Sequence, residues 1–166
     1  DLEKLHAYKQ WIMATVSYDH NAADKVDFRE NNDPWQIIRV FDENSETNVV
    51  CEGYSKAFQY LCDLSDFDAE VESFLVTGYA GGPHMWNIVT IGGTNYLVDV
   101  TNCDEKTVGA PDGLFLKGMT ENSAAVKYSK IFNSSTVTFT YDSDTTSYYD
   151  ESILTVSTTD YTPSAV

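Results

Sequence analysis

The sequence has little basic charge and no long apolar run. Ten lysines and arginines stand against 26 aspartates and glutamates, so the net charge of the 166 residues is −16. A surface this acidic repels phosphate backbones and anionic lipid head groups, which argues against nucleic acid and membrane surfaces as partners. No apolar run approaches the ~20 residues that a bilayer-spanning helix needs, so membrane insertion is not expected.

Cysteine is also scarce. The three cysteines, Cys51, Cys62 and Cys103, include no C-x-x-C pair, which excludes the signatures of a disulfide framework and of a zinc ribbon. An odd number leaves at least one thiol without a partner inside the chain. Cys62 is expected in the core. Cys103 is expected on a loop a few residues past Asp99, where an ordinary loop cysteine is favoured over a second reactive thiol.

The chain begins at Asp1, without an initiator methionine or a signal peptide. This start predicts a segment of a longer precursor that is flanked by other domains. The length and the 13% aromatic content suit one domain with a full core. We expect a single domain over residues 1–141, with residues 142–166 as its C-terminal edge strand or linker-like tail.

Apolar periodicity predicts helices first and strands afterwards. Steps of three and four predict helices over 2–16 and 51–64, and Asp33 with Pro34 indicates the start of a short helix between them. The period then changes to two, which predicts strands over 73–79, 84–91 and 96–101, with weaker candidates at 114–117 and 136–141. This order is typical of an α+β fold with an antiparallel sheet.

A two-residue hairpin turn at Gly92 and Gly93 predicts how two of these strands pair. It places Trp86 opposite Asp99, so that His84 becomes a diagonal neighbour of Asp99 on the same face. Such neighbours lie ~7–8 Å apart at the backbone, within reach of an imidazole and a carboxylate. A histidine held by an aspartate is a base in need of a proton donor.

The best candidate donor is Cys51, which opens the predicted helix over 51–64. Backbone N–H groups and the dipole at a helix N-terminus stabilise a thiolate, and the same groups can bind an oxyanion. Cys51, His84 and Asp99 thus follow the logic of nucleophile, base and orienting group. Tyr18 and Trp35 are candidates for a side-chain donor to the oxyanion, with packing as the alternative.

Three segments resemble the signature blocks of the transglutaminase-like superfamily, whose bacterial members belong among the papain-like folds. They are CEGYSKAF at 51–58, HMWN at 84–87 and YLVDVT at 96–101. The resemblance implies a nucleophile-bearing central helix on an antiparallel sheet, with Cys51 as nucleophile, His84 as general base and acid, and Asp99 orienting His84. The triad needs no cofactor and no metal. Trp86 is expected in the core or the pocket wall rather than in a catalytic role.

The sequence departs from the common family pattern at two places. Val49 stands where a glycine often precedes the nucleophile, and Asn102 and Cys103 follow the aspartate block where an aromatic residue is common. Both departures bear on the shape of the substrate pocket.

The predicted function is acyl transfer on a peptide or protein amide through a thioester. Water as acceptor makes a peptidase or amidase, which we favour slightly; a primary amine makes a transglutaminase. The alternatives are a catalytically silent module that binds a peptide or glycan, and a zinc site of Cys51, His84, Asp99 and Cys103. Composition and resemblance together predict a secreted or cell-surface bacterial protein.

Overall fold

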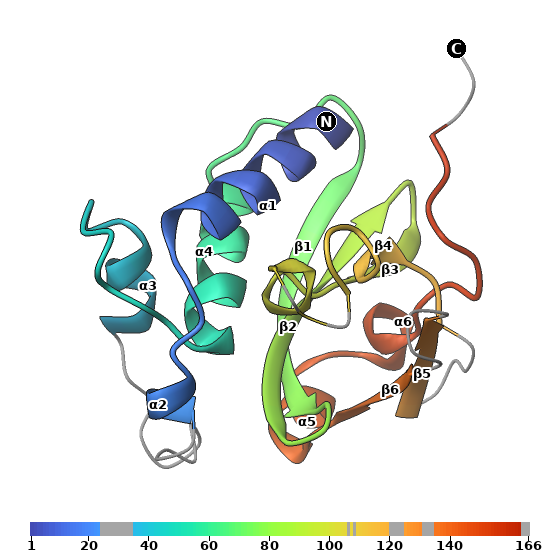
Figure 1. Cartoon of the computed structure of the whole chain (residues 1–166). Coiled ribbons are helices and arrows are strands. Elements are labelled where there is room, and N and C mark those ends of the chain that lie inside the picture. Colours follow the sequence, from blue (N-terminus) through green and yellow to red (C-terminus); the bar gives the residue numbers. More distant parts are fainter. Residues whose placement is uncertain (24–34, 106, 108, 120–124, 131–134, 164–166) are drawn as a thin grey trace.

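The computed structural model describes residues 1–23, 35–105, 107, 109–119, 125–130 and 135–163. Its first four helices lie together on one side of a sheet (Figure 1); they are α1 (Leu2–Thr15), α2 (His20–Ala23), α3 (Trp35–Val40) and α4 (Cys51–Asp63). The helices predicted over 2–16 and 51–64 are therefore confirmed. The predicted start at Asp33 and Pro34 lies outside the described residues. Within the described parts of the chain, no helix is both long and apolar enough to cross a membrane.

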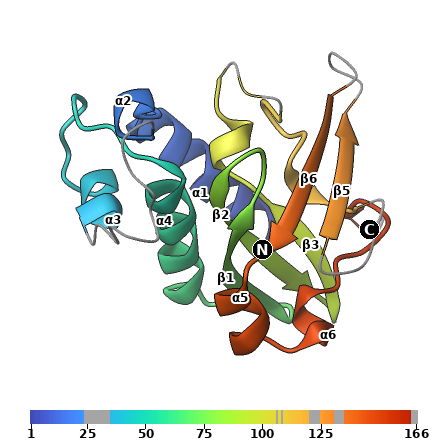
Figure 2. The same cartoon turned by 90° about the horizontal axis from the view of Figure 1, so that it is seen from below.

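Helix α4 is the central helix of this layer. It packs on strands β1 (Val71–Tyr79) and β2 (Pro83–Ile91), while α3 covers its outer side (Figure 2). The reason lies in the spacing of Tyr54, Ala57 and Phe58, which puts all three on one face of the helix, where they are fully buried. This packing places Cys51, the first residue of α4, beside the sheet.

The sheet has six antiparallel strands in the order β4-β3-β2-β1-β6-β5. The remaining strands are β3 (Thr94–Val98), β4 (Phe115–Lys117), β5 (Ala125–Lys130) and β6 (Ser135–Tyr141). The predicted α+β class with an antiparallel sheet is confirmed. Strand β5 was not predicted, and it lies at the edge of the sheet beyond β6.

The hairpin of β2 and β3 has the predicted turn but ends earlier than predicted. Ile91 pairs with Thr94, and Gly92 and Gly93 both adopt positive φ, as a tight turn of this kind requires. The pairing stops at Val98, so Trp86 does not pair with Asp99. The predicted strand over 96–101 is therefore wrong in its last three residues.

Asp99 is the first residue of this run that no longer pairs with β2. Its N–H donates to the carbonyl of Leu114 at 2.8 Å, and a short 3₁₀ helix, η1 (Thr101–Cys103), follows. A carboxylate oxygen of Asp99 accepts the N–H of Asn102 at 3.4 Å, within the first turn of η1. The turn redirects the backbone but keeps the Asp99 side chain on the side of His84.

Residues 142–163 do not form the edge strand or linker expected for this part of the chain. They contain two short helices, α5 (Ser143–Tyr148) and α6 (Glu151–Leu154), which pack against β1 and β2. Asp142 caps α5 by accepting the N–H of Thr145. The Asn95 side chain on β3 donates to the carbonyls of Ser152 and Thr155 at 2.7 and 2.9 Å, which ties the segment to the sheet.

Candidate active site

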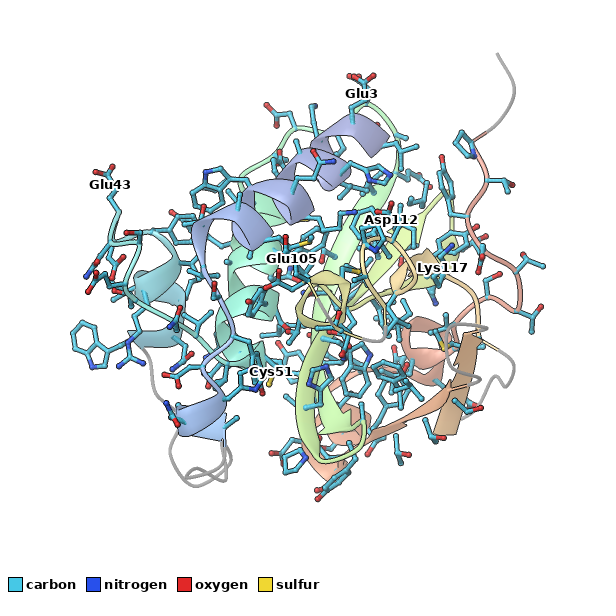
Figure 3. The ribbon with its side chains drawn as sticks, viewed as in Figure 1. Glu3, Glu43, Cys51, Glu105, Asp112 and Lys117 are labelled. Atoms are coloured by element: carbon cyan, nitrogen blue, oxygen red, sulfur yellow. The ribbon has the colours of Figure 1, made fainter. Side chains whose placement is uncertain are left out.

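Cys51 is the first residue of α4 and is 4% exposed. The backbone just before it is held by Gln36 of α3, whose buried side-chain carbonyl accepts the N–H of Val50 at 2.9 Å. Val49 packs so closely on Gly53 that a Cβ added to this glycine would lie 2.6 Å from the Cβ of Val49. Figure 3 shows Cys51 at the end of α4 that faces strand β2.

His84 and Asp99 meet as the sequence suggested, although by a different backbone route. His84 Nε2 lies 2.8 Å from Asp99 Oδ2. Asp99 is fully buried and His84 is 7% exposed. Because Nε2 is bonded to the carboxylate, Nδ1 is the ring nitrogen left to exchange a proton with the Cys51 thiol, which also interacts with the imidazole.

The surroundings of His84 favour its charged form. Burial by itself would lower the pKa of His84, but the charge and hydrogen bond of Asp99, together with the Cys51 thiol, raise this pKa to about 10. The imidazole is therefore protonated at neutral pH. The Cys51 thiol lies next to this imidazole, at the N-terminus of α4.

The other two thiols have a different environment. Burial raises the pKa of Cys62 and that of Cys103 to about 12. Cys62 belongs to the hydrophobic core, as predicted, and Cys103 lies fully buried in η1 rather than on an open loop. Neither has appreciable thiolate at neutral pH.

Two polar residues that sequence reasoning missed connect α4 to β2. Ser55 Oγ lies 2.9 Å from the carbonyl of Cys51 and 2.7 Å from that of Met85. Asn87 Nδ2 donates to the Ser55 carbonyl at 3.2 Å. Both are buried. The available signal was a polar residue within an otherwise apolar stripe of each element.

Asn102 was singled out only as a departure from the family pattern, and the structure places its side chain on Asp99. Its Nδ2 donates to Asp99 Oδ2 at 2.7 Å, the same oxygen that binds His84 Nε2. Among the described residues, the Asp99 carboxylate thus accepts hydrogen bonds from three groups: the imidazole, the Asn102 side-chain amide and the Asn102 backbone N–H.

A cleft of about 920 Å³ opens at His84. Its walls are residues of α1, the segment 17–20, the turn between β1 and β2, and described residues of the segment 101–107. Tyr18 lines the cleft, and its backbone forms an isolated bridge with Val49, close to the nucleophile. Asp104 and Glu105 are also part of the wall, so the cleft shares the acidic character of the whole chain.

The other two aromatic candidates lie elsewhere. Trp35 is 58% exposed at the start of α3 and is not among the described residues that line the cleft. Trp86 is fully buried behind His84, and the two rings stack with their centroids 5.9 Å apart. Its indole N–H has no hydrogen-bond partner among the described residues.

A zinc site finds no support in this arrangement. Among the described residues, no group of three or more His, Cys, Asp or Glu side chains is placed to hold a metal ion.

Comparison with known proteins finds partial relatives. No family model matches the chain. The chain is 33% identical over 114 residues to kyphoscoliosis peptidase of Homo sapiens and 32% identical over 114 residues to that of Mus musculus. Each match covers 61% of this chain, and the chain spans about 16% of the length of either relative. This similarity agrees loosely with the resemblance to the transglutaminase-like superfamily.

Proposed function

We propose that this chain is a cysteine-dependent acyl-transfer enzyme that acts on peptide or protein amide bonds. The observation that carries the proposal is the buried hydrogen bond of 2.8 Å between His84 and Asp99, next to the Cys51 thiol at the start of α4. Burying a carboxylate without a partner costs free energy. Its pairing with an imidazole that interacts with a thiol is the arrangement that nucleophilic catalysis by cysteine requires.

The first half of the reaction makes a thioester. The Cys51 thiolate attacks the amide carbonyl carbon and forms a C–S bond, while N–H groups at the start of α4 stabilise the oxyanion. Tyr18, which lines the cleft near this point, is the side-chain candidate for a further donor. The C–N bond then breaks as the His84 imidazolium gives its proton to the leaving amine.

The second half restores the enzyme. Neutral His84 takes a proton from the acceptor, which attacks the thioester carbon and displaces the Cys51 thiolate. Asp99 keeps Nε2 of the imidazole occupied in both halves, so that Nδ1 faces the reacting atoms. Water as acceptor gives hydrolysis and a primary amine gives transamidation. The name of the partial relatives, a peptidase, favours water.

Site-resolved alkylation tests this function without a known substrate. Native protein is treated with iodoacetamide at pH 7, and the three cysteines are followed by mass spectrometry. We expect Cys51 to react about 100-fold faster than Cys62 or Cys103, and we expect this advantage to disappear in His84→Ala. Equal rates at all three cysteines would instead favour the silent module that binds a peptide or glycan in the cleft.

A peptide library supplies the complementary test. Wild-type protein should cleave or cross-link members of the library, while Cys51→Ala, folded as judged by circular dichroism, should do neither. Turnover that survives in this variant would refute the assignment.

We further propose that the chain belongs to a longer secreted or cell-surface protein. This rests on its acidic composition and its Ser/Thr-rich C-terminal part. The bacterial source suggested by the resemblance is part of this proposal, and the relatives found are mammalian.

A further inference from the structure

We propose that Asn102 is a positioning residue of this site. Its side-chain amide holds the Asp99 carboxylate in the rotation that binds His84, and it weakens the hydrogen bond between that carboxylate and the imidazole. The inference rests on the proposed function for its catalytic meaning. The contacts that carry it are those of Asn102 with Asp99 itself.

The two carboxylate oxygens of Asp99 have different hydrogen-bond partners. Oδ1 accepts the backbone N–H of Asn102 at 3.4 Å, and Oδ2 accepts both Asn102 Nδ2 at 2.7 Å and His84 Nε2 at 2.8 Å. The backbone and the side chain of Asn102 therefore each donate a hydrogen bond to one of the two carboxylate oxygens. Rotation of the carboxylate about its Cβ–Cγ bond would break both contacts with Asn102 as well as the one with His84.

A shared oxygen also changes the strength of the bond to His84. A donor to a carboxylate oxygen stabilises its negative charge and reduces its pull on a second proton. Asn102 therefore keeps His84 less basic than Asp99 alone would make it. The leaving amine needs a proton from the imidazolium, so a His84 that is held less tightly is a better acid.

The position of Asn102 in the fold suits this role. It lies in η1, three residues beyond Asp99, and it lines the cleft. Its carbonyl accepts Thr107 Oγ1 at 2.6 Å, which ties it to the loop that follows. The family pattern often has an aromatic residue after the aspartate block, and an aromatic side chain has no equivalent amide to give.

Other ionisable groups also face His84 and Asp99, and they must stay constant in a test. Cys51 reaches His84 from α4, and Cys103 acts on Asp99 from η1. Further groups lie along the cleft or act on Cys103, namely His20, Asp104, Glu105, Lys9 and Asp112. Replacing Asn102 by an apolar residue of similar size leaves all of these in place.

The test is a titration of His84 by NMR in Asn102→Leu. The chain has three histidines, and comparison with His84→Gln assigns the signal of His84. We expect the midpoint of His84 to move upward by about half to one pH unit from its value in the wild type, because Asp99 loses a competing donor. Asn102→Ala serves as the second variant if the leucine variant does not fold.

Thr107→Val is the matched control. It removes the Thr107 hydroxyl that donates to the Asn102 and Asp104 carbonyls, but it leaves Asp99 untouched. A merely structural loop contact predicts the same small disturbance in both variants. An unchanged midpoint in both Asn102 variants, a downward shift, or an equal upward shift in Thr107→Val would overturn the proposal.

The titration needs no substrate, so the inference and the proposed function can fail separately. If Cys51 is unreactive but the His84 midpoint moves, Asn102 positions a site with no acyl transfer. If Cys51 is reactive but the His84 midpoint is unchanged in the Asn102 variants, the proposed function stands and Asn102 does not influence the pKa of His84. If both hold, the alkaline limb of the activity profile should move upward with the His84 midpoint.

Discussion

Ser55 on α4 lies 2.7 Å from the carbonyl oxygen of Met85 on β2, and Met85 directly follows His84. The same hydroxyl lies 2.9 Å from the carbonyl of Cys51. One buried side chain therefore connects the residue that carries the thiol with the strand that carries the imidazole. The separation of Cys51 and His84 depends on this contact between two elements that the sequence places apart.

Ser55→Ala should therefore weaken both stability and activity. It leaves the Met85 carbonyl without its donor, which we expect to cost about 1–3 kcal/mol in the free energy of unfolding. The rate of Cys51 alkylation should fall about tenfold, because the thiol and imidazole lose their fixed separation. Chemical denaturation and mass spectrometry measure the two effects.

Ser73→Ala is the matched control for this prediction. Ser73 Oγ lies 2.9 Å from Gln59 Oε1, so it also connects α4 to the sheet, but about one turn further from Cys51 than Ser55 does. Its loss should lower stability and leave Cys51 reactivity unchanged. Equal loss of reactivity in both variants would show that general loosening, rather than the Ser55 contact, controls the site.

Asp99→Asn should change the pH dependence of the site as well as its rate. Without the carboxylate, burial dominates, so the pKa of His84 falls from about 10 to below its ordinary value of 6.5. Loss of the orienting charge should lower the rate by about 10²–10⁴. Alkylation of Cys51 or turnover, followed from pH 5 to 11, should show the alkaline limb moving to lower pH; an unmoved limb would contradict the role of Asp99.

The pairing of His84 with Asp99 should make stability depend on pH. The folded protein keeps the His84 proton up to about pH 10, whereas an unfolded histidine loses it near 6.5. The contribution is complete below about pH 6.5 and decreases as pH rises toward 10, because the folded state then binds more protons than the unfolded state. Urea denaturation of wild type and His84→Gln should give a difference that shrinks over this window. A constant difference would exclude a charged pair.

Gly53 and Val49 should be energetically coupled. A Cβ at Gly53 would lie 2.6 Å from Val49 Cβ and 2.8 Å from its Cγ2. Gly53→Ala should therefore cost about 1–3 kcal/mol of stability. The double variant Val49→Gly/Gly53→Ala should lose less free energy of unfolding than the two single variants lose in sum, because the smaller residue at position 49 removes the clash. Additive losses in this cycle would mean that the backbone shifts to accept the new methyl group.

Local patterns in the sequence are sufficient for the front helices and the central hairpin. Apolar steps of three and four specify α1 and α4, because each helix buries one stripe. Gly92 and Gly93 specify the register of β2 and β3, because few other residues adopt their positive φ. That register brings His84 near Asp99, and the position of Cys51 at a helix start also follows from local signals.

What tertiary structure decided is the exit of the chain at Asp99 and everything that depends on it. Asp99 no longer pairs with β2, and its N–H donates to the carbonyl of Leu114, fifteen residues away. The hydrogen bonds from Asn102 to the Asp99 carboxylate form in η1, which follows at once. The place of α6 on the sheet is likewise fixed by Asn95, whose side chain donates to carbonyls almost sixty residues further on. Such bonds join groups that are distant in sequence, and no local period of the chain encodes them.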